Sequence, residues 1–489
     1  MALVTSLAVN LLDPAQDRQG EPVQLVWDDQ GVIRQIIPLP EDQARELPWA
    51  VPAGVDAHTH IVSEGVHLAR ALAGSDAVPA LARLAPLYHQ VGFVTAIDAA
   101  VLPEDAPRVH RWVRQLTGLD VGFLVLAAHH PAVLREIRAR SQTGLKHVLQ
   151  DLVGEAHAIG VKVVNPSGAG RAPLTSLEAP GPYGFSPGEH LRRLAEAVAE
   201  LSWPHPLHIH GLDLGVPGNV KTTLEMLQIL EGLPVHLAHL QFHCYGQAEG
   251  GGLASGAAAV ADWINGHPEV SCDVGQIAFG DTVTLSNDLA LQARLKSRHG
   301  NRWAVVEGED GGLAAVPYRY DPKQATNAIQ WAVGLELALL IDNPWQVFCS
   351  TDHPNGGGFW QYPLIERWLM DRGARDAIYR QFPKEVRRQL VLGTIAREYS
   401  DQEMAVFTSA GPARRLGLQQ KGQLGLGAHA DLALYARTGS RLDWGRPTAV
   451  VRRGRWVWDG RETADGQRCP ASLWRLAPSA RVEEDADDV

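Results

Sequence analysis

The sequence predicts an α/β protein: a TIM-like (β/α)8 barrel beside a small β-sandwich domain that both ends of the chain build. Eight short apolar segments alternate with longer helix-like stretches in the middle of the chain, which is the pattern of such a barrel. The two ends are instead rich in short β-branched runs. Polar residues suited to binding a metal recur where the predicted barrel strands end.

The N-terminal 50 residues contain the runs VQLVWDD and GVIRQIIPL, which the turn-like residues 28–31 separate. The runs ADLALYART and AVVRRGRWVWDGRE near the other end have the same character. We therefore expect residues 1–50 and 411–475 to form one composite β-sandwich domain. The tail 476–489 contains RVEEDADDV, with five acids and one base, and is predicted to lack order.

Residues 51–410 should form the barrel. Helix-like stretches such as GEHLRRLAEAVAEL separate its expected strands, and a long interval, 276–345, predicts an insertion after strand seven. The expected strands are 51–57, 92–98, 119–127, 160–165, 205–210, 234–240, 269–275 and 346–352.

Composition excludes several classes of protein. The 489 residues carry a formal net charge of −11, which disfavours a nucleic-acid partner. No stretch of 18 apolar residues predicts a membrane helix. The four cysteines form no C-x-x-C pair, which argues against a zinc ribbon, a ferredoxin-type cluster or a disulfide framework and fits a reducing cytoplasmic compartment.

The predicted strand ends carry the residues for chemistry, because the active site of a (β/α)8 barrel lies at the C-terminal ends of its strands. Residues two apart on a strand point the same way, so both histidines that end strand one should face the barrel axis. The candidate ligands are His58 and His60 on strand one, Lys162 on strand four, His210 on strand five, His239 on strand six and Asp352 on strand eight.

These residue types suit zinc chemistry. Neutral imidazoles bind Zn²⁺ well, and Asp352 can bind the same ion and carry a proton. Burial lowers the pKa of a lysine such as Lys162, so that its neutral amine can react with CO2 to give a carbamate that bridges two metals. Each residue alone has an ordinary structural reading, such as a solvated lysine or a helix-capping aspartate. Their joint occurrence on five strands favours a metal site.

Other polar residues lie close to these ligands in sequence. His208 and His210 face the same side of strand five, and we favour His210 as the ligand because it lies nearer the strand end. His208 is then expected to support a ligand or to pack. His243, His353, Asn165 and Asn355 are candidates for orienting a ligand or contacting the substrate, and a purely structural role for the two histidines is equally compatible with the sequence.

The phrases PAGVDAHTHI, GVKVVNPSG, HIHGLDLGVPGN, HLAHLQFHCYG and STDHPNGGGFW resemble the A-subunit family of formylmethanofuran dehydrogenase, within the amidohydrolase superfamily. That family includes the corresponding component of the bacterial formyltransferase/hydrolase complex. The resemblance runs from about Pro52 to Leu434. The sequence Gly211-Leu212-Asp213 departs from the Asn-rich archaeal pattern, and this favours the bacterial type.

The resemblance implies an amidohydrolase-type barrel with two zinc ions. The first would take His58, His60 and Asp352, the second His210 and His239, and carboxylated Lys162 would bridge them. The implied reaction is hydrolysis of a formylated methylofuran-type C1 carrier to formate and the free amine. The implied partners are the other subunits of the complex, including the formyltransferase subunit, and the carrier's acidic tail would need basic residues such as Arg171, Arg319 or Lys323.

Two alternative functions remain open from the sequence. One is a cyclic-amide hydrolase of the hydantoinase or dihydroorotase kind, which would use the same site. The TDHPNGG and QFHCYG blocks disfavour it. The other is a non-catalytic scaffold subunit that holds the carrier for its partners, which the presence of every expected ligand disfavours.

Overall fold

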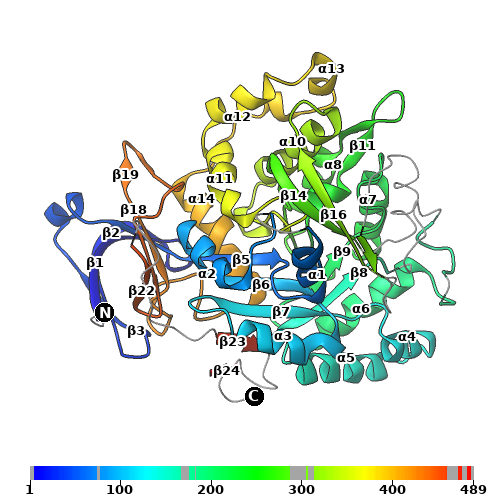
Figure 1. Cartoon of the computed structure of the whole chain (residues 1–489), viewed down its shortest axis with the longest axis horizontal. Helices are drawn as coiled ribbons and strands as arrows, with labels where there is room; N and C mark the ends of the chain where they lie inside the picture. Colours follow the sequence, from blue (N-terminus) through cyan, green and yellow to red (C-terminus); the bar gives the residue numbers. More distant parts are fainter. Residues whose placement is uncertain are drawn as a thin grey trace.

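The fold is that of a computed structural model, which describes residues 5–73, 77–166, 176–181, 183–286, 304–306, 313–459, 472–475 and 482–485. Within these residues, eight parallel strands form a nearly closed barrel, as the sequence predicted. Helices surround it at the right of Figure 1. The barrel strands, in order, are β5 (Gly54–Thr59), β6 (Phe93–Val101), β7 (Asp120–Leu126), β8 (Gly160–Val164), β9 (Leu207–His210), β10 (Val235–Leu237), β13 (Val270–Asp273) and β17 (Val347–Phe348).

The barrel strands are buried and largely apolar, except for the polar residues that face the site, because helices cover the outside of the barrel and side chains fill its interior. All residues of β5 and β7 are buried. Helix α6 has a capped start: Ser186 Oγ accepts a hydrogen bond from Glu189 N at 3.0 Å, and Pro187 occupies the first turn. The helices up to strand eight are α1 (Glu64–Ala73), α2 (Leu81–Gln90), α3 (Ala106–Val113), α4 (Pro131–Arg138), α5 (Gln142–Ala156), α6 (Pro187–Glu200), α7 (Val220–Ile229), α8 (Ala257–Asn265) and α10 (Ala325–Leu340).

Hydrogen bonds just beyond the strands join the first strand to the eighth. Ser350 Oγ donates to the carbonyl of His58 at 2.8 Å, and the N–H of His60 donates to the carbonyl of His353 at 2.8 Å. These bonds place the residues after β17 beside the His-x-His pair.

The expected insertion after strand seven contains a three-stranded antiparallel sheet, in the order β14 (Gly280–Ser286), β16 (Leu313–Tyr320), β15 (Ala304–Val306). Helix α10 follows it and is buried over most of its length. After β17 the chain forms α11 (Tyr362–Met370), α12 (Arg372–Tyr379), α13 (Lys384–Arg387), α14 (Asp401–Ala405) and α15 (Gly411–Leu416).

A seven-stranded mixed sheet combines the two ends of the chain, at the left of Figure 1. The expectation of one first strand over 51–57 was wrong, because the chain leaves this sheet and enters the barrel there. Trp49–Pro52 pairs with β1 and β18, whereas the barrel strand begins at Gly54. The strand order is β22 (Arg455–Trp458), β21 (Ala449–Arg452), β18 (Leu432–Tyr435), β4 (Trp49–Pro52), β1 (Ser6–Asp13), β2 (Arg18–Trp27), β3 (Ile33–Pro38).

Two short strands lie beyond residue 459. β23 (Ser472–Arg475) pairs with β24 (Val482–Asp485) and touches the start of β7 through Leu473 and Val121. The rest of the acidic tail lies outside the described residues, so its lack of order stays a prediction. Among the helices that the structure describes, none has the length and apolar character needed to cross a membrane.

A buried ion cluster ties the β-domain to the barrel. Asp120, at the start of β7, is fully buried and accepts hydrogen bonds from Lys421 and Arg452. Lys421 Nζ also donates to Asp431 Oδ2 at 2.5 Å. Burial would raise the pKa of Asp120, but Arg452 and Lys421 hold it well below its ordinary value. The cluster therefore holds a charged carboxylate.

Replacing Asp120 by Asn should lower the free energy of unfolding by about 3–5 kcal/mol, because two buried cations lose their shared anion. Urea unfolding of the full chain measures this. In the wild type, ionised Asp120 should stabilise the fold fully above the unfolded-state pKa of about 4. This stabilisation should be lost progressively as the pH falls from there toward the lower folded-state pKa of Asp120. Asp281→Asn is the control, since it removes a pair with Arg319 in which both side chains are 71% exposed. Equal losses of stability in the two variants would contradict the role of Asp120 as the anion that Lys421 and Arg452 share.

Candidate metal centre

The His-x-His pair faces Asp352 at the mouth of the barrel. The ring centroids of His58 and His60 are 5.5 Å apart. Nε2 of His58 and Nε2 of His60 lie 3.3 and 3.1 Å from Oδ1 of Asp352. Burial would raise the pKa of Asp352, but His239 and His58 hold it well below its usual value. Asp352 is therefore a carboxylate aimed at two imidazole nitrogens.

Asp352 is held in place by its own turn and by the inserted sheet. Its N–H donates to Ser350 Oγ at 2.7 Å, and its Oδ2 accepts from Asn355 Nδ2 at 3.0 Å. Asn355 Oδ1 in turn accepts from Leu285 N on β14 at 2.6 Å. The bond from Leu285 N fixes the orientation of the Asn355 amide, so that Nδ2 faces Oδ2 of Asp352 while Oδ1 of Asp352 faces the histidines.

Lys162 projects from β8 into the same cluster. Its side chain is 1% exposed, and Nζ lies 3.0 Å from His58 Nε2. Burial lowers the pKa of Lys162 to about 8 even though the carboxylates of Asp352 and Asp273 act against the shift. Burial therefore favours the neutral amine, which can act as a nucleophile.

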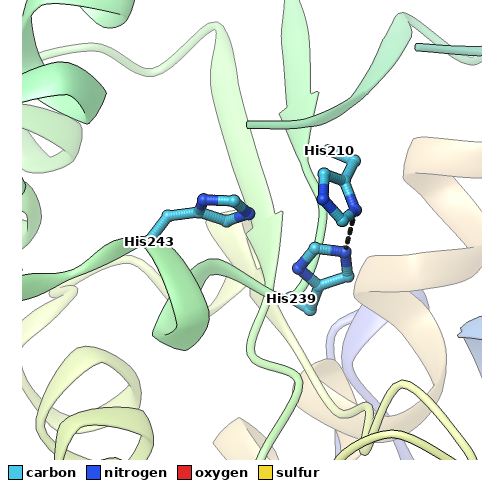
Figure 2. Close-up of side chains that lie close together, drawn as sticks. All are labelled: His210, His239 and His243. Atoms are coloured by element: carbon cyan, nitrogen blue, oxygen red, sulfur yellow. Dashed lines mark hydrogen bonds between the residues drawn. The ribbon is translucent and has the colours of Figure 1, made fainter. Parts of the chain in front are cut away.

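His210, His239 and His243 form a second group, shown in Figure 2. His239 follows β10 with a left-handed backbone (φ 34°), and its Nε2 lies 2.8 Å from His210 Nδ1. Burial lowers the pKa of His210 and of His239 well below 6.5. Both rings are therefore neutral, and at most one proton lies between the two nitrogens.

His243 completes this group from the turn after His239. Its Nδ1 lies 3.2 Å from the carbonyl of Leu212, so Nδ1 carries the proton and donates it there. Burial lowers the pKa of His243 to about 4. Nε2 is buried and has no hydrogen-bond partner among the described residues. Figure 2 shows one ring nitrogen of His243 turned toward the other two histidines.

His208 lies deeper in the barrel than His210. Its Nε2 is 3.4 Å from His58 Nδ1, on the side of His58 away from Lys162. Asp273, at the end of β13, lies in the same layer, with Oδ2 at 2.9 Å from His58 Nδ1. Burial would raise the pKa of Asp273, but His58 and His236 hold it well below the ordinary value. Asp273 is therefore a buried anion.

Asp98, in the C-terminal half of the second barrel strand β6, approaches His60. Its Oδ2 accepts hydrogen bonds from three consecutive backbone N–H groups, residues 61–63, at 2.7–2.8 Å. Its Oδ1 is 3.7 Å from His60 Nδ1. Burial alone would lower the pKa of His60, but Asp352 and Asp98 raise it to about 9. A metal ion bound to His60 would displace this proton.

Sequence reasoning missed Asp98 and Asp273. The signal that would have found them is the one used for the ligands, a polar residue at the end of a barrel strand. Asp98 closes the expected strand 92–98, and Asp273 lies in the expected strand 269–275.

The remaining candidate residues differ in the contacts that they make. His353 Nδ1 lies 3.3 Å from the Gly357 carbonyl, and burial lowers the pKa of His353 to about 3. Asn165 follows β8 with φ 44°, and its carbonyl accepts from His129 Nε2 at 3.1 Å.

Of the basic residues expected to contact the carrier's acidic tail, Arg171 lies outside the described residues, Arg319 pairs with Asp281 at the surface, and Lys323 sits in an exposed turn.

The donor chemistry of the cluster fits metal ions. His239 Nδ1 and His243 Nε2 are buried without a hydrogen-bond partner among the described residues, and the neutral rings offer lone pairs. The histidines and aspartates form three groups of three residues, and within each group the possible ligand atoms lie within 4.8 Å of one another. His58 and His239 each belong to two of these groups.

Comparisons with known proteins agree with this architecture. The family model described as "Amidohydrolase family" matches residues 82–458. The chain is 32% identical to the A subunit of the formyltransferase/hydrolase complex Fhc of Methylorubrum extorquens, over 97% of this chain and 91% of that protein. It is 30% identical to protein FwdA of Methanocaldococcus jannaschii, over 92% and 86% of the two chains.

A solved structure is similar over nearly the whole fold. It is the crystal structure of the formyltransferase/hydrolase complex (FhcABCD) from Methylorubrum extorquens in complex with methylofuran. One of its chains matches with a TM-score of 0.88 and 30% identity, over 96% of this chain and 91% of that one. The chain therefore belongs to the amidohydrolase family and, within it, to the family that contains FwdA and the A subunit of the formyltransferase/hydrolase complex.

Proposed function

We propose that this chain hydrolyses the formamide of a formylated methylofuran-type C1 carrier, giving formate and the free amine. The observation that carries the proposal is one buried cluster built from five barrel segments. In it, Lys162 Nζ and Asp352 Oδ1 lie 3.0 and 3.3 Å from the same nitrogen of His58. A nucleophilic amine, a carboxylate and neutral imidazoles meet there, as a binuclear hydrolase requires.

Two zinc ions are the proposed cofactors. His58, His60 and Asp352 would hold the first ion, and His210 and His239 the second. Lys162 would bind both after carboxylation, in which the neutral Nζ attacks CO2, an N–C bond forms, and the amine proton leaves. The burial of Lys162 supports this step because it increases the neutral fraction of the amine.

The proposed mechanism assigns the proton transfers to Asp352. Two zinc ions held by these residues would supply a water of lowered pKa and a Lewis acid for the formyl oxygen. Asp352 Oδ1 accepts the proton that the attacking water loses, and delivers it to the nitrogen that leaves when the C–N bond breaks. Asn355 donates to Oδ2, and this bond holds the carboxylate with Oδ1 toward the histidines.

The relatives support the substrate class and the partners. The similar crystal structure is of a complex named FhcABCD and contains methylofuran, and one relative is named as the A subunit of that complex. We propose accordingly that this chain works beside a formyltransferase and the other subunits of such a complex. The formyltransferase would load the carrier that this site then hydrolyses.

Asp352→Asn should keep the fold and lower the rate of formate release by about 10²–10⁴-fold, because the amide cannot accept the proton. The assay measures formate from formylated carrier, with thermal unfolding as the check on folding. Asp151→Asn, on the exposed face of the outer helix α5, is the matched control and should keep full activity. Near-normal turnover by Asp352→Asn, or turnover of hydantoins in place of the formylated carrier by the wild type, would contradict the proposal.

Lys162→Gln should reduce bound zinc from about two ions per chain to one or none, because the amide cannot form the bridging carbamate. Metal analysis of the purified full chain measures this. Lys146→Gln, which removes a surface pair with Glu200, should leave the zinc content unchanged. Wild-type zinc content in Lys162→Gln would exclude the bridging role, and a metal-free wild type that still binds its partners would favour a scaffold function.

A further inference from the structure

We propose that Asp273 is a positioning residue that fixes the tautomer of His58 and thereby prepares both ion sites for metal. This rests on the proposed zinc chemistry but concerns a residue outside the ligand set. Asp273 ends the seventh barrel strand, where its side chain is fully buried behind the ligands.

Asp273 contacts both parts of the cluster with different oxygens. Oδ2 lies 2.9 Å from His58 Nδ1, a residue assigned to the first ion. Oδ1 accepts the backbone N–H of His239 at 2.8 Å, where the chain turns through its left-handed conformation before the second group of histidines. A single carboxylate thus aligns a ring of one site and the backbone of the other.

The tautomer of His58 follows from what surrounds its Nδ1. Asp273 Oδ2 only accepts hydrogen bonds, so Nδ1 carries the proton. In the neutral ring Nε2 then presents its lone pair, which accepts from Lys162 Nζ at 3.0 Å. Nε2 is the atom that faces Lys162 and Asp352. A histidine needs this tautomer in order to bind a metal through Nε2.

A chain of histidines behind His58 leads to the same tautomer independently. His205 Nδ1 lies 3.3 Å from the carbonyl of Arg415, which can only accept, so Nδ1 carries the proton and Nε2 accepts. His208 Nδ1, 3.2 Å from that Nε2, is then the donor. This leaves His208 Nε2 as an acceptor at 3.4 Å from His58 Nδ1. His208 therefore acts behind His58, which separates its role from that of His210.

An asparagine at position 273 cannot replace the carboxylate, although it has the same shape. Its single oxygen can accept from His239 N or from His58 Nδ1, but not from both. With the oxygen toward His239, the amide N–H₂ would face His58 Nδ1 and favour the tautomer whose Nε2 is protonated. That tautomer cannot bind a metal through Nε2.

The test is the zinc affinity of the metal-stripped full chain, measured by competition with a chelator. Asp273→Asn should bind zinc about 10–100-fold more weakly than the wild type. Ser271→Ala, on the same strand as Asp273, is the matched core control. It removes the 2.8 Å contact to Nδ1 of His236, a ring whose Nε2 lies 3.2 Å from Asp273 Oδ2, but it leaves the contacts of Asp273 with His58 and His239 in place, and it should keep wild-type affinity. Wild-type affinity in Asp273→Asn, or an equal loss in both variants, would overturn the proposal.

A measurement on the metal-free wild type decides the matter if Asp273→Asn does not fold. Nitrogen-15 NMR of the histidine rings should show His58 protonated at Nδ1, and protonation at Nε2 would overturn the proposal. Failure of the proposed function is separable, because it would appear as absent formate release or absent zinc in the wild type. The His58 tautomer and the ratio of variant affinities do not depend on turnover.

Discussion

Closure of the barrel between its first and eighth strands is the constraint on which the site depends. The bonds from Ser350 to the His58 carbonyl and from His60 N–H to the His353 carbonyl join two segments almost 300 residues apart. They bring Asp352 within 3.3 Å of both histidines of the pair. The inserted sheet stabilises the same turn through Asn355. The insertion after strand seven thus helps to position Asp352 at the mouth of the barrel.

The second feature of the site is the balance of charge in a buried space. Neutral imidazoles cost less to bury than cations, and burial lowers the pKa values of His210, His239 and His243. Three carboxylates, those of Asp98, Asp273 and Asp352, remain charged because histidines or backbone N–H groups surround them. The cluster therefore offers imidazole lone pairs together with negatively charged carboxylates. Bound divalent cations would neutralise that negative charge.

Much of the fold and of the site was predictable from strand-end chemistry. The barrel, the insertion and the proximity of His58, His60, Lys162, His239 and Asp352 follow from one rule, that parallel strands end on one face. Asp98 and Asp273 obey the same rule, but acids at strand ends commonly cap helices, so the sequence alone does not single them out. The order of His208 and His210 along strand five was predictable from their distance to the strand end, but the contacts that join His205, His208 and His58 were not, because they connect separate strands. The left-handed turn at His239 depends on contacts with β13, which the local sequence does not encode.

The most direct test of the binuclear site is a crystal structure of the full chain with anomalous scattering measured at the zinc edge. We expect two zinc peaks, one beside His58, His60 and Asp352 and the other beside His210 and His239. We also expect density for a carboxyl group on Lys162 Nζ between them. A single peak, no peak, or an unmodified lysine beside two ions would contradict the proposed site.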